Sequence, residues 1–495
     1  MTKGNTLTTS SSPLTGVSDT DVKRVTAPVS PPPLIESAFI GEIRTVNEYP
    51  TAETIDKLYD QLDFQRACQA FLRNMMASSM YSFREGLRRD LGATTPQHYV
   101  TWEGPFDANS LLLTPNSETV YGVGYLALDA DGPTVIEAPP GVLGVLNDMW
   151  MREVENIGMA GPDQGSGGSY LVVPPGYDGE VPEGYFVARP QTYGVWLALR
   201  AFRTPDGDAG PAVATHKQIR VYPLSRKDDP PEMTFVNASG RVLDTIHPVD
   251  SRYFDDLAQL VAEEHEDAID PETAGMLAAI GIAKGEPFAP DQRMRRILDE
   301  AATVASYMAL ATSYKSRLPL QRYDDRQWIE IANTGYPEYR LGNHTMLEGV
   351  SLMGWFATVS SKAMVRPMLG KGSVYMWTYT SGDGEWLDGG KSYRLHLSSG
   401  IPAANFWSIV LYDVWTRSIL ANGQSAASKN SYDPAVAVND DGSVDLYFGP
   451  EPPDAAASNW IRTLPGKGWF IMLRLYGPLE GYMDTSWKPS DIEPA

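Results

Sequence analysis

The segment TPNSETVY places a carboxamide, a carboxylate and a phenol close together in the chain. Glu118 and Tyr121 can transfer protons and Asn116 can hold a substrate by hydrogen bonds, so these three are candidate catalytic residues. In a regular strand Asn116 and Glu118 would share one face, and Tyr121 would lie on the other. A bulge near Gly122 or Gly124 would bring all three together. The structural alternative is that Asn116 caps a turn and Tyr121 packs in the core.

A second group of candidates lies in the segment DMWMREVE. On a strand, Asp148, Trp150 and Arg152 would share one face, and Glu153 and Glu155 would share the other. Trp150 and Arg152 are therefore candidate ligand-binding residues, and the paired carboxylates suit acid–base chemistry. The alternative is a strand with an ordinary solvated face.

Aromatic rings and polar side chains also occur together in the strand-like segments near the C-terminus. A ring beside a polar group suits a sugar or another flat, hydroxylated ligand, although Trp and Tyr also fill the cores of β-sandwiches. The candidate ligand-binding residues in this part of the chain are Trp407, Tyr412, Asp413, Arg474 and Tyr476.

Arg474 differs from the others because it interrupts the apolar run WFIMLRLYG. A cation inside a buried strand needs a partner, since an unpaired buried charge is costly. Asp413 and Asp445 are the partners that we expect. Such a pair can be purely structural.

Nucleophilic and metal-dependent sites have little support in the sequence. The nearest match to a nucleophile elbow, GSGGS at residues 165–169, lies in a Gly-rich stretch typical of a connector. The six histidines are dispersed, and none lies two to five residues from another as zinc and cupin motifs require. We therefore expect neither a metal nor a cofactor.

The charge of the chain excludes two classes of partner. Its 495 residues carry a formal net charge of -22, which opposes binding to nucleic acid or to an anionic membrane surface. No apolar run has the length of a signal peptide core or of a spanning helix, so we expect a cytoplasmic protein. The single cysteine, Cys68, is expected to pack as a small apolar residue.

The composition and the spacing of apolar and turn-forming residues along the chain indicate the elements that position these residues. The first 45 residues are rich in Ser, Thr and Pro and are expected to form a disordered tail. Helical spacing over residues 51–89 is followed by short strands that Gly and Pro turns separate. We expect a first module over residues 46–245, a helical connector over 246–345 and a second module over 346–495. The predicted fold class is mainly β with helical insertions, as two antiparallel jelly-roll-like β-sandwich modules.

This order of segments resembles the paired domains of unknown function numbered twelve-fifty-four and twelve-fourteen. TPNSETVY is similar to the Pro-Asn-x-Asp-Thr-x-Tyr motif of the first domain, with Glu118 where Asp is commoner. The helix-like stretch over residues 281–302 is similar to the link between the two domains. The C-terminal matches are NFWS, LYD, NDDGS, NW and RLYGP. The resemblance covers roughly residues 95–490 and implies two jelly-roll-like modules with helical insertions, but it implies no reaction.

The hypothesis that these observations favour is an enzyme, a hydrolase or a lyase, that acts on a small organic or saccharide-like substrate with carboxylate and tyrosine acid–base groups. The alternative is a non-catalytic ligand-binding or assembly protein of the double-jelly-roll type, for which a homo-oligomer would be natural. A pocket lined by Glu118, Tyr121, Arg474 and Tyr476 would favour the enzyme. A flat, apolar, self-complementary face would favour assembly.

Overall fold

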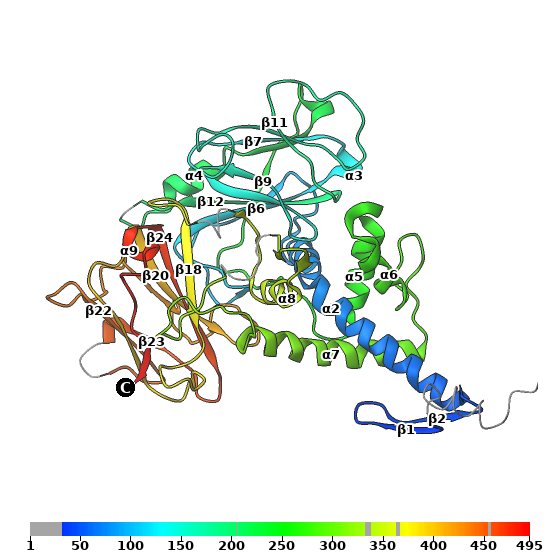
Figure 1. Ribbon diagram of the computed structural model, residues 1–495. Coiled ribbons are helices and arrows are strands. Elements are labelled where there is room, and N and C mark those ends of the chain that lie inside the picture. Colours follow the sequence, from blue (N-terminus) through cyan, green and yellow to red (C-terminus); the bar gives the residue numbers. More distant parts are fainter. Residues whose placement is uncertain (1–31, 205, 332–337, 363–366, 454–456) are drawn as a thin grey trace, which may run out of the picture. The chain divides into compact units, whose positions relative to one another are not determined.

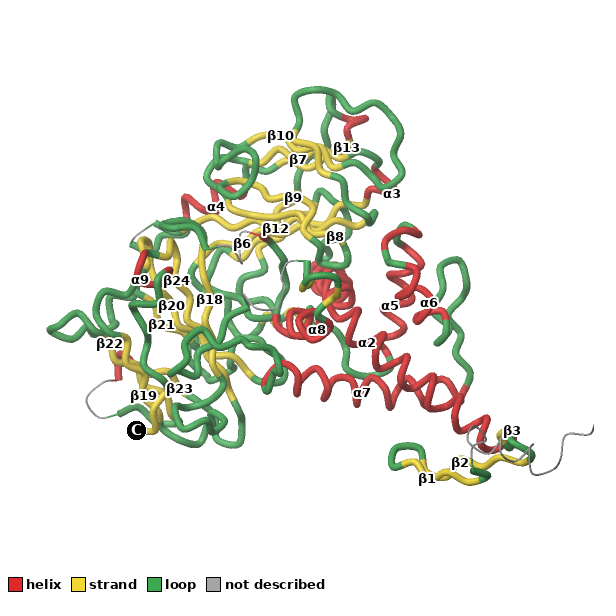
Figure 2. The backbone as a smooth tube through the Cα atoms, in the orientation of Figure 1, coloured by secondary structure: helices red, strands yellow, loops and turns green. Residues whose placement is uncertain are grey.

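The computed structural model describes residues 32–204, 206–331, 338–362, 367–453 and 457–495 of the chain. It divides into two compact units, residues 1–65 and residues 66–495, which we describe separately. Figures 1 and 2 show the elements of both. None of the helices in the described ranges is both long enough and apolar enough to cross a membrane.

The described part of the first unit is a small antiparallel sheet followed by the start of a long helix. Its strands are β1 (Leu34–Ser37), β2 (Gly41–Val46) and β3 (Tyr49–Pro50), in the order β1-β2-β3. Asn47 and Glu48 adopt positive φ angles of 51° and 70°, as a tight hairpin turn requires. The disordered tail expected through residue 45 is therefore wrong from residue 34 onward, and residues 1–31 lie outside the described residues.

Helix α2 (Ala52–Leu91) is 40 residues long and agrees with the helix expected over residues 51–89. In the second unit its buried face carries small and apolar side chains, among them Cys68. Burial, with a smaller contribution from Glu300, raises the pKa of the Cys68 thiol to about 11. The thiol is therefore protonated at neutral pH and packs in the core, as expected.

The first β-rich region, residues 98–237, contains two facing sheets. The larger has the strand order β14-β4-β6-β12-β8-β9, and the smaller has the order β11-β10-β7-β13. The strands are β4 (His98–Trp102), β6 (Thr119–Ala127), β7 (Thr134–Ala138), β8 (Leu143–Asp148), β9 (Glu153–Gly158), β10 (Gly168–Val172), β11 (Phe186–Ala188), β12 (Gly194–Phe202), β13 (Arg220–Pro223) and β14 (Thr234–Asn237). The short helices α3 (Leu128–Asp131) and α4 (Gly210–His216) and the pair β5 (Ser110–Leu111) and β15 (Leu243–Asp244) complete it.

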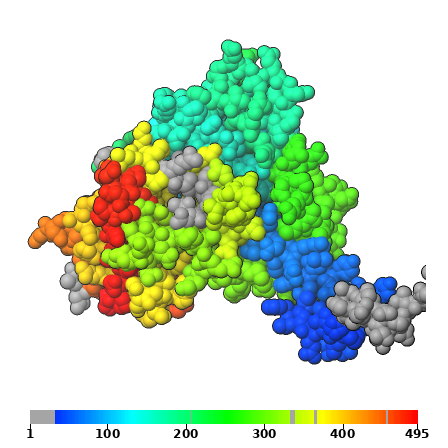
Figure 3. Space-filling model, viewed as in Figure 1, coloured from blue at the N-terminus to red at the C-terminus, as the bar shows by residue number. Residues whose placement is uncertain are grey.

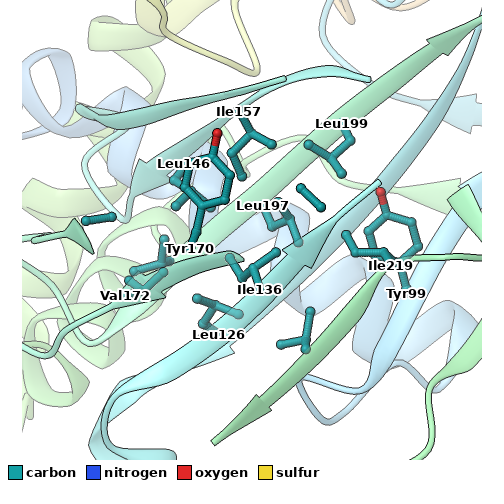
Figure 4. Packing of buried hydrophobic residues seen from close by; sticks show 14 of the residues in the cluster. Tyr99, Leu126, Ile136, Leu146, Ile157, Tyr170, Val172, Leu197, Leu199 and Ile219 are labelled. Carbon is teal, nitrogen blue, oxygen red and sulfur yellow. The ribbon is translucent and has the colours of Figure 1, made fainter. Parts of the chain in front are cut away.

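A hydrophobic core fills the space between these two sheets (Figure 4). Leu126 and Leu197 of the larger sheet pack in one cluster with Ile136 and Tyr170 of the smaller sheet, and all four are almost fully buried. Each such side chain stabilises the fold by about 1.5–3 kcal/mol relative to an exposed position. Because one face of β6 and β12 packs in this core, the position of their opposite face is fixed.

Helices connect the two β-rich regions. They are α5 (Arg252–Glu263), α6 (Pro271–Ala278), α7 (Gln292–Tyr314) and α8 (Leu347–Phe356). Asp270 caps α6 by accepting from the Thr273 backbone N–H, and Asp291 caps α7 by accepting from that of Met294. A short hairpin of β16 (Arg340–Leu341) and β17 (His344–Thr345) precedes α8.

The second β-rich region, residues 373–494, also contains two sheets. Their strand orders are β18-β24-β20-β21 and β23-β22-β19-β25. The strands are β18 (Ser373–Thr378), β19 (Tyr393–Leu397), β20 (Ala403–Asp413), β21 (Ser428–Asn430), β22 (Val444–Gly449), β23 (Trp460–Arg462), β24 (Trp469–Pro478) and β25 (Ile492–Pro494), with helix α9 (Glu480–Met483) before the last. Every residue of β24 is buried.

The β-rich, helix-containing fold class is as expected, but the strands are not all antiparallel. The pairs β4–β14, β10–β11 and β22–β23 are parallel. In each case a connection longer than a hairpin returns the chain to the end of the sheet from which it started, which a parallel pair requires. The Gly- and Pro-rich connections of the sequence did not distinguish these returns from hairpins.

Candidate active site

A cavity of about 640 Å³ lies in the second unit, where the two β-rich regions meet. Strands β6, β8 and β12 of the first region, helix α8, and strands β18 and β24 of the second contribute to its wall. Figure 3 shows cyan residues of the first region directly beside yellow residues of the chain after α8. Asn147 joins these segments, since its side-chain amide donates to the Ser360 carbonyl at 2.8 Å.

Most of the cavity wall is apolar. Large aromatic and aliphatic side chains surround the space, including Phe83, Trp102, Phe106, Trp196, Leu352 and Phe356. An apolar wall with few polar groups is typical of a site for a small organic molecule.

The polar part of the wall is built from two arginine–tyrosine pairs on neighbouring strands. In the first region Arg200 of β12 lies directly opposite Tyr121 of β6. In the second region Arg474 of β24 lies directly opposite Tyr375 of β18. Directly opposed residues of antiparallel strands point to the same face of the sheet, and all four side chains border the cavity.

Hydrogen bonds link these pairs across the boundary between the regions. Arg200 Nη2 donates to Ser373 Oγ at 3.1 Å, and Ser373 Oγ lies 2.8 Å from the hydroxyl of Tyr375. Arg474 Nη2 donates to the carbonyl of Thr114 at 2.8 Å. Its Nε and Nη1 are buried and have no hydrogen-bond partner among the described residues.

The two tyrosines experience opposite shifts in acidity. Burial raises the pKa of Tyr375, but the guanidinium of Arg200, the hydrogen bond with Ser373 and the guanidinium of Arg474 outweigh it, and the net shift is below the ordinary value. Burial raises the pKa of Tyr121, and Arg200 does not offset it. Two groups whose environments separate their pKa values are suited to act as base and acid.

Asn116 both caps a turn and touches the site. Its Oδ1 accepts from the backbone N–H groups of Glu118 and Thr119 at 3.1 and 3.2 Å, which is the structural role considered above. Its Nδ2 also donates to the Tyr121 hydroxyl at 2.6 Å. This contact needs no bulge, because the register of β6 with β12 is continuous past Gly122. Residues 116–118 precede the strand, so strand alternation does not apply to them.

Glu118 does not border the cavity. It is buried behind the wall and accepts from Ser117 Oγ at 2.5 Å. Burial raises the pKa of its carboxyl group, against the opposing effects of Ser117 and Arg474. Its position suits it to influence Arg474 rather than to touch a ligand.

Trp150 and Arg152 are not on a strand and do not line the cavity. The chain turns after β8, with Met151 at a φ of 59°. Asp148 stabilises this turn by accepting from the backbone N–H of Trp150 at 2.9 Å and from Arg152 Nε at 2.6 Å. The shared face expected for Asp148, Trp150 and Arg152 is therefore a local turn, and the indole of Trp150 donates to Asn74 Oδ1.

Among the C-terminal candidates, Arg474 borders the cavity, and Trp407, Tyr412, Asp413 and Tyr476 are buried in the second region without lining it. The Tyr412 hydroxyl donates to the Pro115 carbonyl at 2.6 Å. The ring of Tyr476 stacks on Phe406, with 3.9 Å between centroids.

Arg474 is buried, as expected, but neither expected carboxylate pairs with it. Asp413 accepts from Lys467 Nζ at 2.5 Å and from the backbone of the turn that follows it. Asp445 pairs with Arg394 and with His396, each at 2.8 Å. Both aspartates have nearer cations, which is why Arg474 interacts instead with backbone carbonyls.

The sequence analysis did not identify Arg200, Tyr375 and Ser373 as site residues. Arg200 carries the same signal as Arg474, because it interrupts the apolar run VWLALRAF. A single tyrosine in the strand SVYMWT carries no comparable signal. Within the described ranges no group of three or more His, Cys, Asp or Glu side chains could hold a metal ion.

In this chain the two β-rich regions share one cavity, and each supplies an arginine–tyrosine pair. The chain matches two family models, Protein of unknown function (DUF1254) over residues 97–223 and Protein of unknown function (DUF1214) over residues 372–480. Arg200 and Tyr121 lie in the first domain, and Arg474 and Tyr375 lie in the second. The family resemblance noted in the sequence is thereby confirmed.

One solved structure shares the fold, and a second is less similar. The VPA0106 protein from Vibrio parahaemolyticus is 17% identical, with a TM-score of 0.52 over 88% of this chain and 100% of that chain. An uncharacterized protein from Burkholderia cenocepacia is 12% identical, with a TM-score of 0.41 over 88% of this chain and 94% of that chain. No curated protein matches the sequence.

Proposed function

We propose that this protein is an enzyme, a lyase, that removes a proton and a leaving group from a small organic substrate in the cavity between the β-rich regions. The observation that carries the proposal is that Tyr121 and Tyr375 border one cavity in environments that keep one phenol protonated and favour ionisation of the other. Such a pair supports proton transfer in both directions within one turnover.

In this mechanism the Tyr375 phenolate takes a proton from a substrate carbon. The electron pair of the broken C–H bond forms a double bond to the neighbouring carbon, and the bond from that carbon to the leaving group breaks. Tyr121 donates its proton to the leaving group, and Asn116 orients the Tyr121 hydroxyl through their 2.6 Å hydrogen bond. Proton exchange with water then returns Tyr375 to the phenolate and Tyr121 to the phenol.

The apolar wall favours elimination over hydrolysis, because it provides few groups that could position an attacking water. It also favours an organic substrate over a saccharide, whose hydroxyl groups need many hydrogen-bond partners. We further propose that each β-rich region is a jelly-roll-like sandwich. The two facing sheets around one core in the first region support this architecture.

The proposal is tested by comparing Tyr375→Phe with Tyr323→Phe in any reaction that a screen of small organic substrates reveals. Tyr323 is buried in the second unit, outside the cavity wall, and its hydroxyl lies 3.2 Å from the Trp487 carbonyl. Loss of an acid–base group reduces turnover by about 10²–10⁴-fold, so Tyr375→Phe should lose at least that much and Tyr323→Phe should not. Turnover within a few-fold of the native rate in Tyr375→Phe would overturn the proposed mechanism.

A further inference from the structure

Three cationic side chains and no carboxylate line the described wall of the cavity. The cations are Arg200, Lys371 and Arg474. The imbalance is the reverse of the whole chain, whose formal net charge is -22. A local excess of positive charge in an acidic protein attracts and retains an anion.

The two arginines lack the ion-pair partners that buried guanidiniums usually have. Among the described residues neither of them forms an ion pair with a carboxylate. After burial, the groups that most strongly influence the pKa of Arg200 are tyrosines. Glu118 influences Arg474 from behind the wall, but its hydrogen bonds go to Ser117. One carboxylate behind the wall cannot balance three cations at its surface.

Arg474 is only 2% exposed, and two of its three guanidinium nitrogens have no hydrogen-bond partner among the described residues. Unsatisfied buried donors are rare in native proteins, because each one forfeits its hydration without replacement. Arg474 borders the cavity, so a small rotation of its side chain would let a ligand atom there supply the missing acceptor.

From this geometry we infer that Arg200 and Arg474 together bind the carboxylate of a small monocarboxylic acid whose apolar body fills the rest of the cavity. This inference rests on the proposed function and names its substrate class. A carboxylate is opposite in charge to the guanidiniums and shares their planar geometry. The aromatic and aliphatic wall accepts the remainder of the molecule by burying it from water.

The inference can be tested by binding alone, without any turnover. Phenylacetate and hexanoate are compared with phenylacetamide and hexanamide, which have nearly the same shape but no charge, in a thermal-shift assay and by calorimetry. We expect the two acids to raise the melting temperature and the two amides to leave it unchanged. Equal binding of acids and amides would overturn the inference, and so would tighter binding of phenyl phosphate or inorganic phosphate than of either acid.

Variants of the two arginines identify the binding groups. Arg200→Met and Arg474→Met should each weaken binding of the acids at least tenfold. Arg417→Met is the control, since Arg417 is 1% exposed and has an unpartnered Nη2 among the described residues, but it does not line the cavity. If Arg474→Met does not fold, Arg200→Met and Arg474→Lys decide the question. Unchanged affinity in the arginine variants that fold would overturn the inference.

The same experiment separates this inference from the proposed enzymatic function. Tyr375→Phe should bind the acids at least as tightly as the native protein does, because the guanidiniums are intact and a neighbouring phenolate is removed. Acid binding that depends on the arginines, with turnover unaffected in Tyr375→Phe, would reject the lyase mechanism and keep the carboxylate site. Failure of the acids to bind would reject the carboxylate site even if another substrate class were turned over through Tyr375.

Discussion

Arg474 on β24 lies directly opposite Tyr375 on β18, with its guanidinium carbon 5.7 Å from the centre of the Tyr375 ring. The same strand-to-strand relationship joins Arg200 on β12 to Tyr121 on β6. Each domain therefore presents one cation beside one phenol. Burial raises the pKa of both phenols and both guanidiniums lower it, but at Tyr375 the guanidiniums and the hydrogen bond with Ser373 outweigh burial, whereas at Tyr121 burial outweighs the guanidiniums.

The first prediction concerns the ionisation of Tyr375. Tyrosinate absorbance should begin to rise at a lower pH in the native protein than in Tyr375→Phe, because the two guanidiniums and Ser373 lower the pKa of this phenol. An ultraviolet pH titration of both proteins measures the difference. The same group should make turnover rise with pH through this lowered pKa. Identical titration curves would show that Tyr375 ionises as an ordinary tyrosine.

The sign of the linked stability change follows from the same shift. A phenol whose pKa is lower in the folded than in the unfolded protein contributes stability that is fully present above the unfolded pKa, near 10. That contribution is lost as the pH falls through the folded pKa. The stability difference between native protein and Tyr375→Phe should therefore favour the native protein more at alkaline than at neutral pH.

The second prediction concerns the cost of holding an unpaired cation. Arg200 donates a hydrogen bond to Ser373, its side chain also interacts with Tyr375, and it forms no ion pair with a described carboxylate. Arg200→Met should therefore change the free energy of unfolding by less than about 1 kcal/mol, or increase it. Arg84→Met is the contrast, because it breaks a 2.6 Å pair with Glu263 and should cost ~1–3 kcal/mol. Urea unfolding of both variants makes the comparison.

The third prediction concerns Gly122 of β6, where this strand packs against the core residue Tyr99. A Cβ on Gly122 would lie 2.3 Å from the hydroxyl oxygen of Tyr99, whereas a Cβ on Gly124 would meet Tyr99 at 3.5 Å, an ordinary contact. Gly122→Ala should therefore destabilise the protein by ~1–3 kcal/mol through overpacking. Gly124→Ala should cost much less, and denaturant unfolding of the pair tests this. Equal costs would contradict the packing of Tyr99 against β6.

The fourth prediction concerns acid denaturation. Burial lowers the pKa of His216 to about 4, against the opposing hydrogen bond to the Val120 carbonyl. A histidine with a lowered folded pKa contributes stability that is present above its unfolded pKa near 6.5 and is lost as the pH falls toward 4. This single group should account for ~3 kcal/mol of that loss. His216→Asn should show a flatter stability profile between pH 6.5 and 4, and the exposed His344→Asn should match the native profile.

The sequence predicted the order of β-rich and helical segments, because turn residues and apolar periodicity are local signals. It also predicted that Arg474 is buried, because the residues on both sides of it form an apolar run typical of a buried strand. It did not predict the cavity, because the cavity depends on which strands lie side by side. Arg200 lies 173 residues before Ser373, to which it donates, and Ser373 is on the same strand as Tyr375. The expected partners of Arg474 were wrong for the same reason: Asp413 and Asp445 find nearer cations only in the folded chain.

Strand β24 follows both β18 and β20 in the sequence, yet it occupies an inner position between them in the sheet. A growing polypeptide that has been synthesised only as far as residue 468 would leave the facing edges of β18 and β20 without their neighbour, and exposed strand edges pair readily with other chains. It would also lack Arg474. A chain that stops before β24 would therefore lack the proposed binding site, and a nonsense mutation upstream of residue 469 would produce an aggregation-prone product rather than a shortened, weakly active one.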